Sequence, residues 1–283
     1  MKKNLLYCFV LFILFFNAML VRGQDTVRVL SIGNSFSQDA VEMYFHELGA
    51  SDRVTLIVGN AWIGGCSLEK HWQLASNDST RHTYRKIGAD GKAVTLKNVA
   101  LKTAITDEAW DYISLQQVSG NSGKYDTFFP YLTYLRDYVM SLATNPTVKP
   151  ALHMTWAYAQ DSGHRDFPKY GSDQLKMYRA IVDAYNRAAK TANIDVIIPS
   201  GTAIQNGRTS SIGDRFCRDG YHLDKKIGRY TAACTWYERL TGRSVVGNRF
   251  APVGMSDSEV TIAQHAAHLA NVHPNDLTSL AGY

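Results

Sequence analysis

Short runs of β-branched residues alternate with amphipathic helical patterns along most of the chain, and this alternation restricts the fold more than any other feature. The predicted strands are residues 26–32, 54–58, 112–115, 151–156 and 195–198. Apolar residues recur at helical spacing in residues 128–142, 173–192 and 226–240. Strands separated by helices run parallel, because each helix carries the chain back to the start of the sheet. The sequence therefore predicts an α/β fold: a single three-layer α/β/α domain with a five-stranded, mainly parallel sheet covered on both faces.

Two segments do not belong to this alternation. Residues 82–99 contain the turn sequence Ala89-Asp90-Gly91-Lys92 between alternating segments, which predicts a hairpin insertion. Residues 260–272 predict a helical tail that packs on the outside of the domain. A length of 283 residues, without a repeat or a linker, favours one domain over residues 24–283.

The first 23 residues have the pattern of a targeting segment. Lys2 and Lys3 precede an apolar run over residues 5–21, which is followed by Gly23-Gln24. A basic start, a short apolar stretch and small residues predict a secretory signal peptide over residues 1–23, with an uncleaved anchor as the alternative. The expected location of the mature protein is therefore secreted or periplasmic, and it is not expected to be an integral membrane protein.

Charge and metal-ligating residues exclude several function classes. Loss of Lys2, Lys3 and Arg22 lowers the formal charge from +5 to +2, and no block of basic residues remains. This favours neither nucleic acid nor an anionic membrane as a partner, and no protein partner is predicted. We expect no metal and no cofactor, and at most one disulfide, because the remaining cysteines are few and widely spaced and the histidines of the tail lack an obvious third ligand. These residues are Cys66, Cys217, Cys234, His265, His268 and His273.

The first candidate catalytic residue follows the first strand, in Gly33-Asn34-Ser35. Ligands of parallel α/β sheets bind at the carboxyl ends of the strands. A serine in a tight turn at the start of a helix would expose its hydroxyl there, beside the partial positive charge of the helix N-terminus. The alternative is structural, because Ser35 and Gln38 also match a capping box.

The second candidate lies late in the chain, in Asp219-Gly220-Tyr221-His222. A carboxylate three residues before a histidine can hold one imidazole nitrogen, which leaves the other free to take a proton from a serine. Alone, the pattern is also compatible with a surface histidine beside an incidental aspartate.

Together these motifs resemble the first and last blocks of the SGNH (GDSL-type) hydrolases, with Asn34 where that superfamily has Asp. The similarity covers most of residues 26–242 and is nearest to a branch common in gut Bacteroidetes, a domain of unknown function with IGNSFS, IGGCSLE-type and DGYHLD-type segments. The resemblance implies a flavodoxin-like fold and a serine esterase, with Ser35 as nucleophile, His222 as general base and Asp219 orienting the imidazole.

The resemblance also implies an oxyanion hole. Its donors would be the backbone N–H of Ser35, the N–H of a glycine after the second strand, and a side-chain amide after the third. The glycine is Gly64 or, slightly favoured, Gly65, although both could simply form a tight turn. The third block departs from the usual Gly-x-Asn-Asp, so the amide candidates are Gln116, Gln117 and Asn121.

The predicted substrate is a small-molecule or glycan ester, most specifically an O-acetyl group on carbohydrate. Trp156 could stack on a sugar ring or remain a core residue, and weaker candidates of this kind are Trp62, Tyr125, Tyr158 and Tyr221. The absence of a long apolar lid segment disfavours an interfacial lipase. The alternatives are a non-catalytic carbohydrate-binding protein of the same fold, or a thioesterase, lysophospholipase or methylesterase.

Overall fold

The structure, a computed structural model, describes residues 25–283, so the predicted signal peptide lies outside the described residues. Its centre is a seven-stranded sheet with the order β4-β3-β2-β1-β5-β6-β7. The strands are β1 (Asp25–Gly33), β2 (Val54–Trp62), β3 (His82–Ile87), β4 (Ala93–Val99), β5 (Tyr112–Leu115), β6 (Lys149–His153) and β7 (Val196–Ile198).

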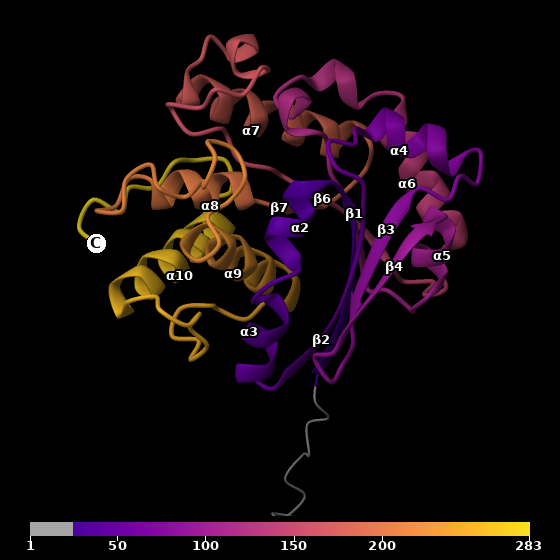
Figure 1. Cartoon of the computed structure of the whole chain (residues 1–283), viewed down its shortest axis with the longest axis horizontal. Coiled ribbons are helices and arrows are strands. Elements are labelled where there is room, and N and C mark those ends of the chain that lie inside the picture. Colours follow the sequence, from indigo (N-terminus) through magenta and orange to yellow (C-terminus); the bar gives the residue numbers. More distant parts are fainter. Residues whose placement is uncertain (1–24) are drawn as a thin grey trace, which may run out of the picture.

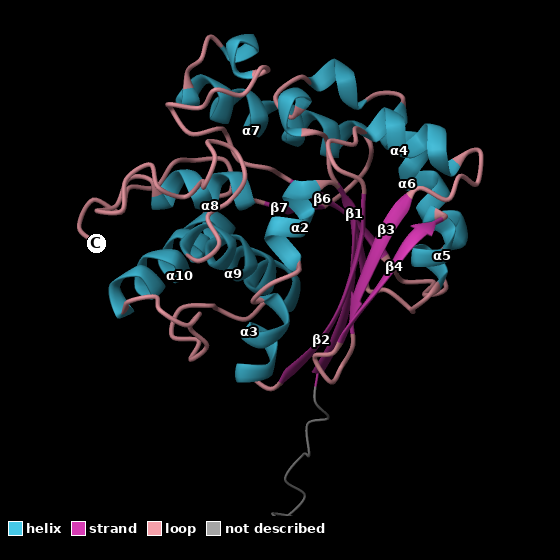
Figure 2. Cartoon of the chain, in the orientation of Figure 1, coloured by secondary structure: helices cyan, strands magenta, loops and turns pink. Residues whose placement is uncertain are grey.

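The strand count corrects the prediction of five. The strands β1, β2, β5, β6 and β7 pair in parallel, and they coincide with the predicted strands to within a few residues. The hairpin of β3 and β4 was predicted as an insertion, but β3 pairs antiparallel with β2 and extends the sheet at that edge (Figure 2). Alternation within residues 82–99 indicates a hairpin but does not say which edge its strands will join.

Helices cover both faces of the sheet, as predicted (Figure 1). On one face α2 and α3 pack on β1 and β2, α9 packs on α2 and α3, and α8 and α10 lie outside on α9. On the other face α5, α6 and α7 pack on the strands, and α4 packs on α6. Their bounds are α2 (Ser35–Val41), α3 (Phe45–Ser51), α4 (Leu68–Ala75), α5 (Leu101–Thr106), α6 (Tyr131–Leu142), α7 (Gln174–Thr191), α8 (Ser200–Gly207), α9 (Ile227–Thr241) and α10 (Asp257–Val272). Short 3₁₀ turns occupy Ser119–Asn121, Tyr125–Phe128 and Phe167–Tyr170.

The tail helix α10 begins earlier than predicted because Ser256 and Glu259 form a complete capping box. Its buried face is rich in alanine, including Ala263, Ala266 and Ala267. Small side chains let α10 lie close against α8 and α9. The tail is therefore an integral part of this face of the domain.

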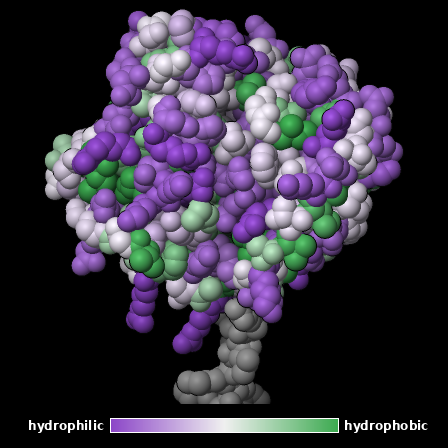
Figure 3. All heavy atoms as spheres, in the orientation of Figure 1, coloured by the Kyte–Doolittle hydropathy of each residue, from purple (hydrophilic) through white to green (hydrophobic). Residues whose placement is uncertain are grey.

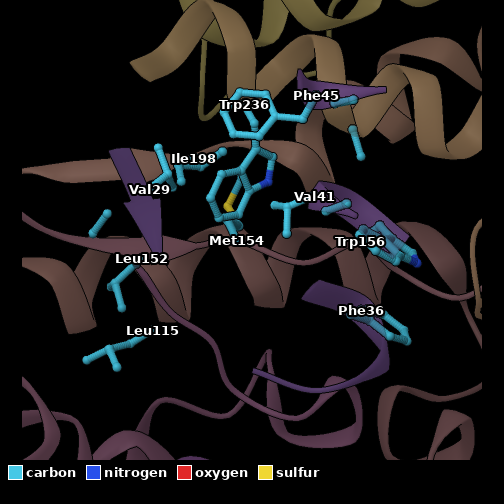
Figure 4. Packing of buried hydrophobic residues seen from close by; sticks show 14 of the residues in the cluster. Val29, Phe36, Val41, Phe45, Leu115, Leu152, Met154, Trp156, Ile198 and Trp236 are labelled. Carbon is cyan, nitrogen blue, oxygen red and sulfur yellow. The ribbon is translucent and has the colours of Figure 1, made fainter. Parts of the chain in front are cut away.

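The core supports the carboxyl end of the sheet. Val29, Leu115, Leu152 and Ile198 come from neighbouring parallel strands and are buried together (Figure 4). Full burial of each such side chain contributes about 1.5–3 kcal/mol. A rigid core beneath the strand ends fixes the loops that follow them.

The surface drawn in Figure 3 is mostly hydrophilic, with hydrophobic residues in separate patches. Within residues 25–283, no helix is both long and apolar enough to cross a membrane.

Candidate active site

Ser35 is the first residue of α2, directly after β1, and its side chain is free of any capping role. Asn34 is the N-cap, and its Oδ1 accepts the Phe36 N–H at 3.0 Å. This corrects the alternative in which Ser35 caps the helix. Gly33 allows the Gln116 side chain to lie close to the end of β1, since a Cβ at position 33 would be only 2.6 Å from Gln116 Oε1.

Ser35, His222 and Asp219 form one hydrogen-bonded chain. Ser35 Oγ lies 2.9 Å from His222 Nε2, and His222 Nδ1 lies 2.7 Å from Asp219 Oδ2. The second carboxylate oxygen of Asp219 accepts the backbone N–H of His222 at 2.7 Å and that of Tyr221 at 3.2 Å. The residues meet although 187 positions separate Ser35 from His222.

The hydrogen bonds at Asp219 also decide its charge. Partial burial alone would raise the pKa of this carboxyl, but the donors from His222 and Tyr221 outweigh it and lower the pKa below its ordinary value. An ionised carboxylate can only accept, so Nδ1 of His222 carries the proton and Nε2 is left to accept from Ser35. Gly220 allows this turn, because its φ of 84° lies in the left-handed region and a Cβ would meet Ser162 Oγ at 2.9 Å.

A buried carboxylate one turn after Ser35 holds the His222 loop in place. Asp39 is 1% exposed and accepts the Leu223 N–H at 2.8 Å. It also pairs with Arg218 at 3.1 Å and with Arg229 at 2.5 Å. Because Leu223 follows His222 directly, this cluster joins α2, the histidine loop and α9. The sequence analysis missed it, since Asp39 alone looks like an ordinary polar helix residue.

Asn34 joins the loops that surround Ser35. Its Nδ2 donates to the Cys66 carbonyl at 3.0 Å, and its Oδ1 accepts from Gln116 Nε2 at 2.8 Å as well as from Phe36 N. An aspartate could accept these bonds but could not donate to Cys66 unless it were protonated. This explains why asparagine suits the position where the resemblance leads one to expect aspartate.

The glycines predicted for the oxyanion hole lie in the exposed loop after β2. Ile63 N donates to Gly33 O at 3.2 Å and holds this loop against the end of β1. Among the hydrogen bonds of residues 25–283, none uses the N–H of Gly64 or Gly65. Gly65 has a φ of 63°, which favours glycine there. Both N–H groups therefore remain available to a ligand.

The three candidate side-chain amides for the oxyanion hole differ in whether they already make hydrogen bonds within the fold. Gln116 is fully buried and donates to Asn34, and Gln117 donates to Thr127 O at 2.9 Å while its Oε1 accepts from Val118 N at 2.8 Å. Their hydrogen bonds within the fold correct the expectation that either amide is free to donate. Asn121 is half-buried, and its side chain makes no hydrogen bond to any described residue.

The aromatic residues considered for substrate binding differ in how far they are buried. Trp156 is 0% exposed, stacks on Phe36 at 4.3 Å and donates its Nε1–H to Tyr221 O. Of the two alternatives for Trp156, the core residue is therefore correct and the substrate contact is wrong (Figure 4). Tyr158 is likewise buried. Tyr221 is half-buried, with its ring 4.3 Å from that of His222.

The structure also places the remaining aromatic candidates, Trp62 and Tyr125, and a histidine that the sequence analysis missed. His164, not singled out from the sequence, lies 4.7 Å from the Tyr221 ring and extends that aromatic surface. Trp62 is half-buried at the end of β2. Tyr125 packs against Arg187, whose guanidinium carbon lies 3.9 Å from the centre of the Tyr125 ring.

Within residues 25–283, the cysteines and the tail histidines form no metal centre. Cys66, Cys217 and Cys234 are free thiols, and burial raises the pKa of Cys66 to about 12 and that of Cys217 to about 11. In the part of the chain that the structure describes, no group of three or more metal-ligating side chains comes together. His268 instead pairs with Glu238 at 2.7 Å.

The mainly parallel sheet with helices on both faces is the fold found in SGNH hydrolases. A candidate SGNH hydrolase from Slackia heliotrinireducens is similar in structure, with a TM-score of 0.52 and 20% identity, covering 76% of this chain and 99% of that one. A family model described as a domain of unknown function, DUF4886, matches residues 28–270, and the chain belongs to this family. A DUF4886 protein from Bacteroides uniformis has a TM-score of 0.89 and 50% identity, covering 90% of this chain and 98% of that one. Among curated proteins none matches the chain.

Proposed function

We propose that the protein is a serine ester hydrolase whose nucleophile is Ser35. The observation that carries this proposal is the hydrogen-bonded chain from Ser35 through His222 to Asp219. A purely structural serine has no need of an imidazole that is itself oriented by a carboxylate. Similarity to the SGNH fold supports the same class of reaction.

In the proposed mechanism, Ser35 Oγ attacks the ester carbonyl while His222 Nε2 takes its proton. Asp219 holds the imidazole in the required tautomer and stabilises its charged form. His222 then protonates the leaving alcohol, and an acyl group remains on Ser35. Water attacks this acyl-enzyme in the same way and releases the acid.

The proposed oxyanion hole consists of the Ser35 N–H, the N–H of Gly64 or Gly65, and the Asn121 amide. These donors are free to bind an oxyanion, because the glycine N–H groups and the Asn121 side chain make no hydrogen bond within the described residues. Donors aimed at the developing negative charge stabilise the transition state more than the bound ester.

For the substrate we propose a short acyl ester, an O-acetyl group, on carbohydrate. Ser35 is half-buried and the neighbouring Gly64 and Gly65 are exposed, so the site is open at the surface. A long acyl chain would need an extended apolar channel, whereas an acetyl group on a bulky polar alcohol suits an open, polar site. Such a substrate fits an exported enzyme, the location proposed from the N-terminal residues.

The test is acetate release and p-nitrophenyl acetate hydrolysis by the purified protein, with Ser35→Ala and His222→Ala beside it. We expect both variants to lose several orders of magnitude in kcat. Matched controls are Ser141→Ala on the exposed surface of α6 and His273→Ala after α10, which should keep full activity.

The result against the proposal is equal inactivity of all variants on a panel of acetyl, methyl and thioesters. If Ser35→Ala then binds a sugar array as well as the unchanged protein, the chain is a carbohydrate-binding protein instead.

A further inference from the structure

A polar cavity of about 420 Å³ lies beside the proposed catalytic residues and is not used by them. It opens to solvent and is lined by residues 159–163, which follow β6, and by residues 214–220, which lead into the histidine loop. The two segments are held together, because Ala159 N donates to Gly220 O at 2.8 Å and Gln160 N donates to Asp214 at 2.7 Å. The cavity is therefore a fixed feature of the fold.

Most of the charged groups around this cavity already have partners. Asp214 pairs with the buried Arg208 at 2.7 Å, Arg218 pairs with Asp39, and Asp219 pairs with His222. These pairs hold the walls of the cavity and leave little of their charge for a ligand.

Asp161 and Arg215 differ from the other charged residues of the cavity. Within residues 25–283, the carboxylate of Asp161 makes no hydrogen bond or ion pair, and only the Nε of Arg215 is used, donating to Ile212 O. Ser162 accepts from His164 N, and its own hydroxyl proton remains available. The cavity thus offers acceptors and donors together, with balanced charge, which is the pattern that neutral hydroxyl groups require.

The position of the cavity indicates which part of a substrate it can hold. Asp219 belongs both to its wall and to the triad, so the imidazole of His222 lies between Ser35 and the cavity. The proposed acyl group is short and is attached to Ser35, at the other end of this hydrogen-bonded chain from Asp219. The leaving alcohol must lie beside His222, which protonates it, and a long alcohol can continue toward the cavity.

Two aromatic rings lie beside His222 and belong to residues next in sequence to residues that line the cavity. The Tyr221 ring lies 4.3 Å from His222 and 4.7 Å from His164, and both Tyr221 and His164 are half-buried. Aromatic rings pack well against the apolar faces of sugar rings, while a polar cavity suits hydroxyl groups.

We propose that this cavity is a subsite for an uncharged sugar ring next to the esterified one, so that the substrate is an acylated oligosaccharide or polysaccharide. The inference rests on the proposed esterase function and specifies its substrate. A chain carrying carboxylate or phosphate groups is not favoured over an uncharged one, because the carboxylate of Asp161 offsets the charge of Arg215.

The experiment compares kcat/KM for acetylated oligosaccharides of glucose, mannose and xylose with kcat/KM for p-nitrophenyl acetate. In the unchanged protein, we expect kcat/KM to rise at least tenfold from the acetylated monosaccharide to the trisaccharide in at least one series. In Asp161→Ala and Arg215→Ala, the ratio of oligosaccharide to p-nitrophenyl acetate kcat/KM should fall at least tenfold, mainly through KM. Matched controls are Asp183→Ala and Arg179→Ala, which line a cavity of about 370 Å³ on α7 and should leave the ratio unchanged.

The outcomes separate the two proposals. Turnover of p-nitrophenyl acetate without any dependence on sugar chain length, or with unchanged ratios in both cavity variants, overturns the subsite alone. Preference for an acetylated uronic acid oligosaccharide overturns the assignment to an uncharged sugar. No turnover of any ester by the unchanged protein refutes the esterase function, and the subsite proposal falls with it.

Discussion

At the scale of single residues, Asn34 gives a sharp test because it both donates and accepts around the proposed nucleophile. Asn34→Asp keeps the acceptor for Phe36 N and Gln116 but sets a carboxylate oxygen against the Cys66 carbonyl. We expect the free energy of unfolding to fall by about 1–3 kcal/mol at neutral pH, with a parallel loss of esterase activity. Urea unfolding and p-nitrophenyl acetate kinetics measure the two effects.

The pH dependence distinguishes this cause from general damage. Once protonated, the introduced carboxyl group could again donate to the Cys66 carbonyl, so the stability deficit should shrink as the pH is lowered. Asn77→Asp, at an exposed position where the side chain donates to Gln73 O, is the matched control and should change little. A deficit in Asn34→Asp that does not vary with pH would contradict the explanation.

Asn121 supplies the second prediction at this scale. If its amide is the third oxyanion donor, Asn121→Ala should lower kcat by about 10²–10³ with little change in KM. Stability should change little, because the Asn121 side chain makes no hydrogen bond to the described residues. Kinetics on p-nitrophenyl acetate test this, and an unchanged kcat would leave only backbone donors in the hole.

Sequence reasoning located Ser35, Asp219 and His222 because each belongs to a short local pattern. It could not foresee Asp39, since its bonds to Arg218 and Leu223 span 179 and 184 positions. Nor could it separate Gln117, which is tied to Thr127, from the available Asn121. Such assignments depend on packing between segments that are distant in the chain.

At the scale of elements, the Asp39 cluster joins α2 to the loop that carries His222. Asp39→Asn should leave Arg218 and Arg229 without their buried carboxylate and lower stability by about 3–5 kcal/mol. At a temperature where the variant is folded, we expect kcat to fall and the pH–rate profile to shift, because His222 loses its support. The control Asp183→Asn removes a carboxylate from the exposed pair with Arg187 at 3.1 Å and should have little effect.

A folded Asp39→Asn variant with the kcat and pH profile of the unchanged protein would refute this positioning role. Circular dichroism and urea unfolding establish the folded fraction before the kinetic comparison. Loss of stability alone would assign Asp39 to the fold and not to the geometry of the proposed site.

Periodicity located the parallel strands well because each is a short apolar run with helices on either side. Periodicity predicted the helices less well where contacts between distant segments determine their ends or their burial. The helix predicted to start at Ser35 ends at Val41, and α3 begins at Phe45, directly after Tyr44, whose φ is 70°. Every residue of α8 is buried, so no solvent-exposed side gives its sequence an amphipathic period.

At the scale of the whole molecule, buried histidines link stability to pH. His71 Nδ1 lies 3.0 Å from His82 Nε2. His71 Nε2 donates to the carbonyl of Gly33 at 2.9 Å, next to the proposed site. Burial, together with the neighbouring His82, lowers the pKa of His71 to about 3, and burial lowers that of His82 to about 4. Burial also lowers the pKa of His153 to about 3.

The sign of the effect follows from proton uptake. In the folded protein each of these histidines stays neutral from about pH 6.5 down to about pH 4, whereas in the unfolded chain it gains a proton near pH 6.5. The unfolded state therefore binds more protons, and stability should fall as the pH drops from about 6.5 toward 4, by up to about 1.4 kcal/mol per pH unit for each histidine. Urea unfolding across this range, compared between the unchanged protein, His153→Gln and His71→Gln/His82→Gln, should show a shallower slope in the variants. His273→Gln, at an exposed position, should keep the original slope. A flat stability profile between pH 6.5 and 4, or identical slopes in all variants, would mean that these histidines do not couple folding to acid.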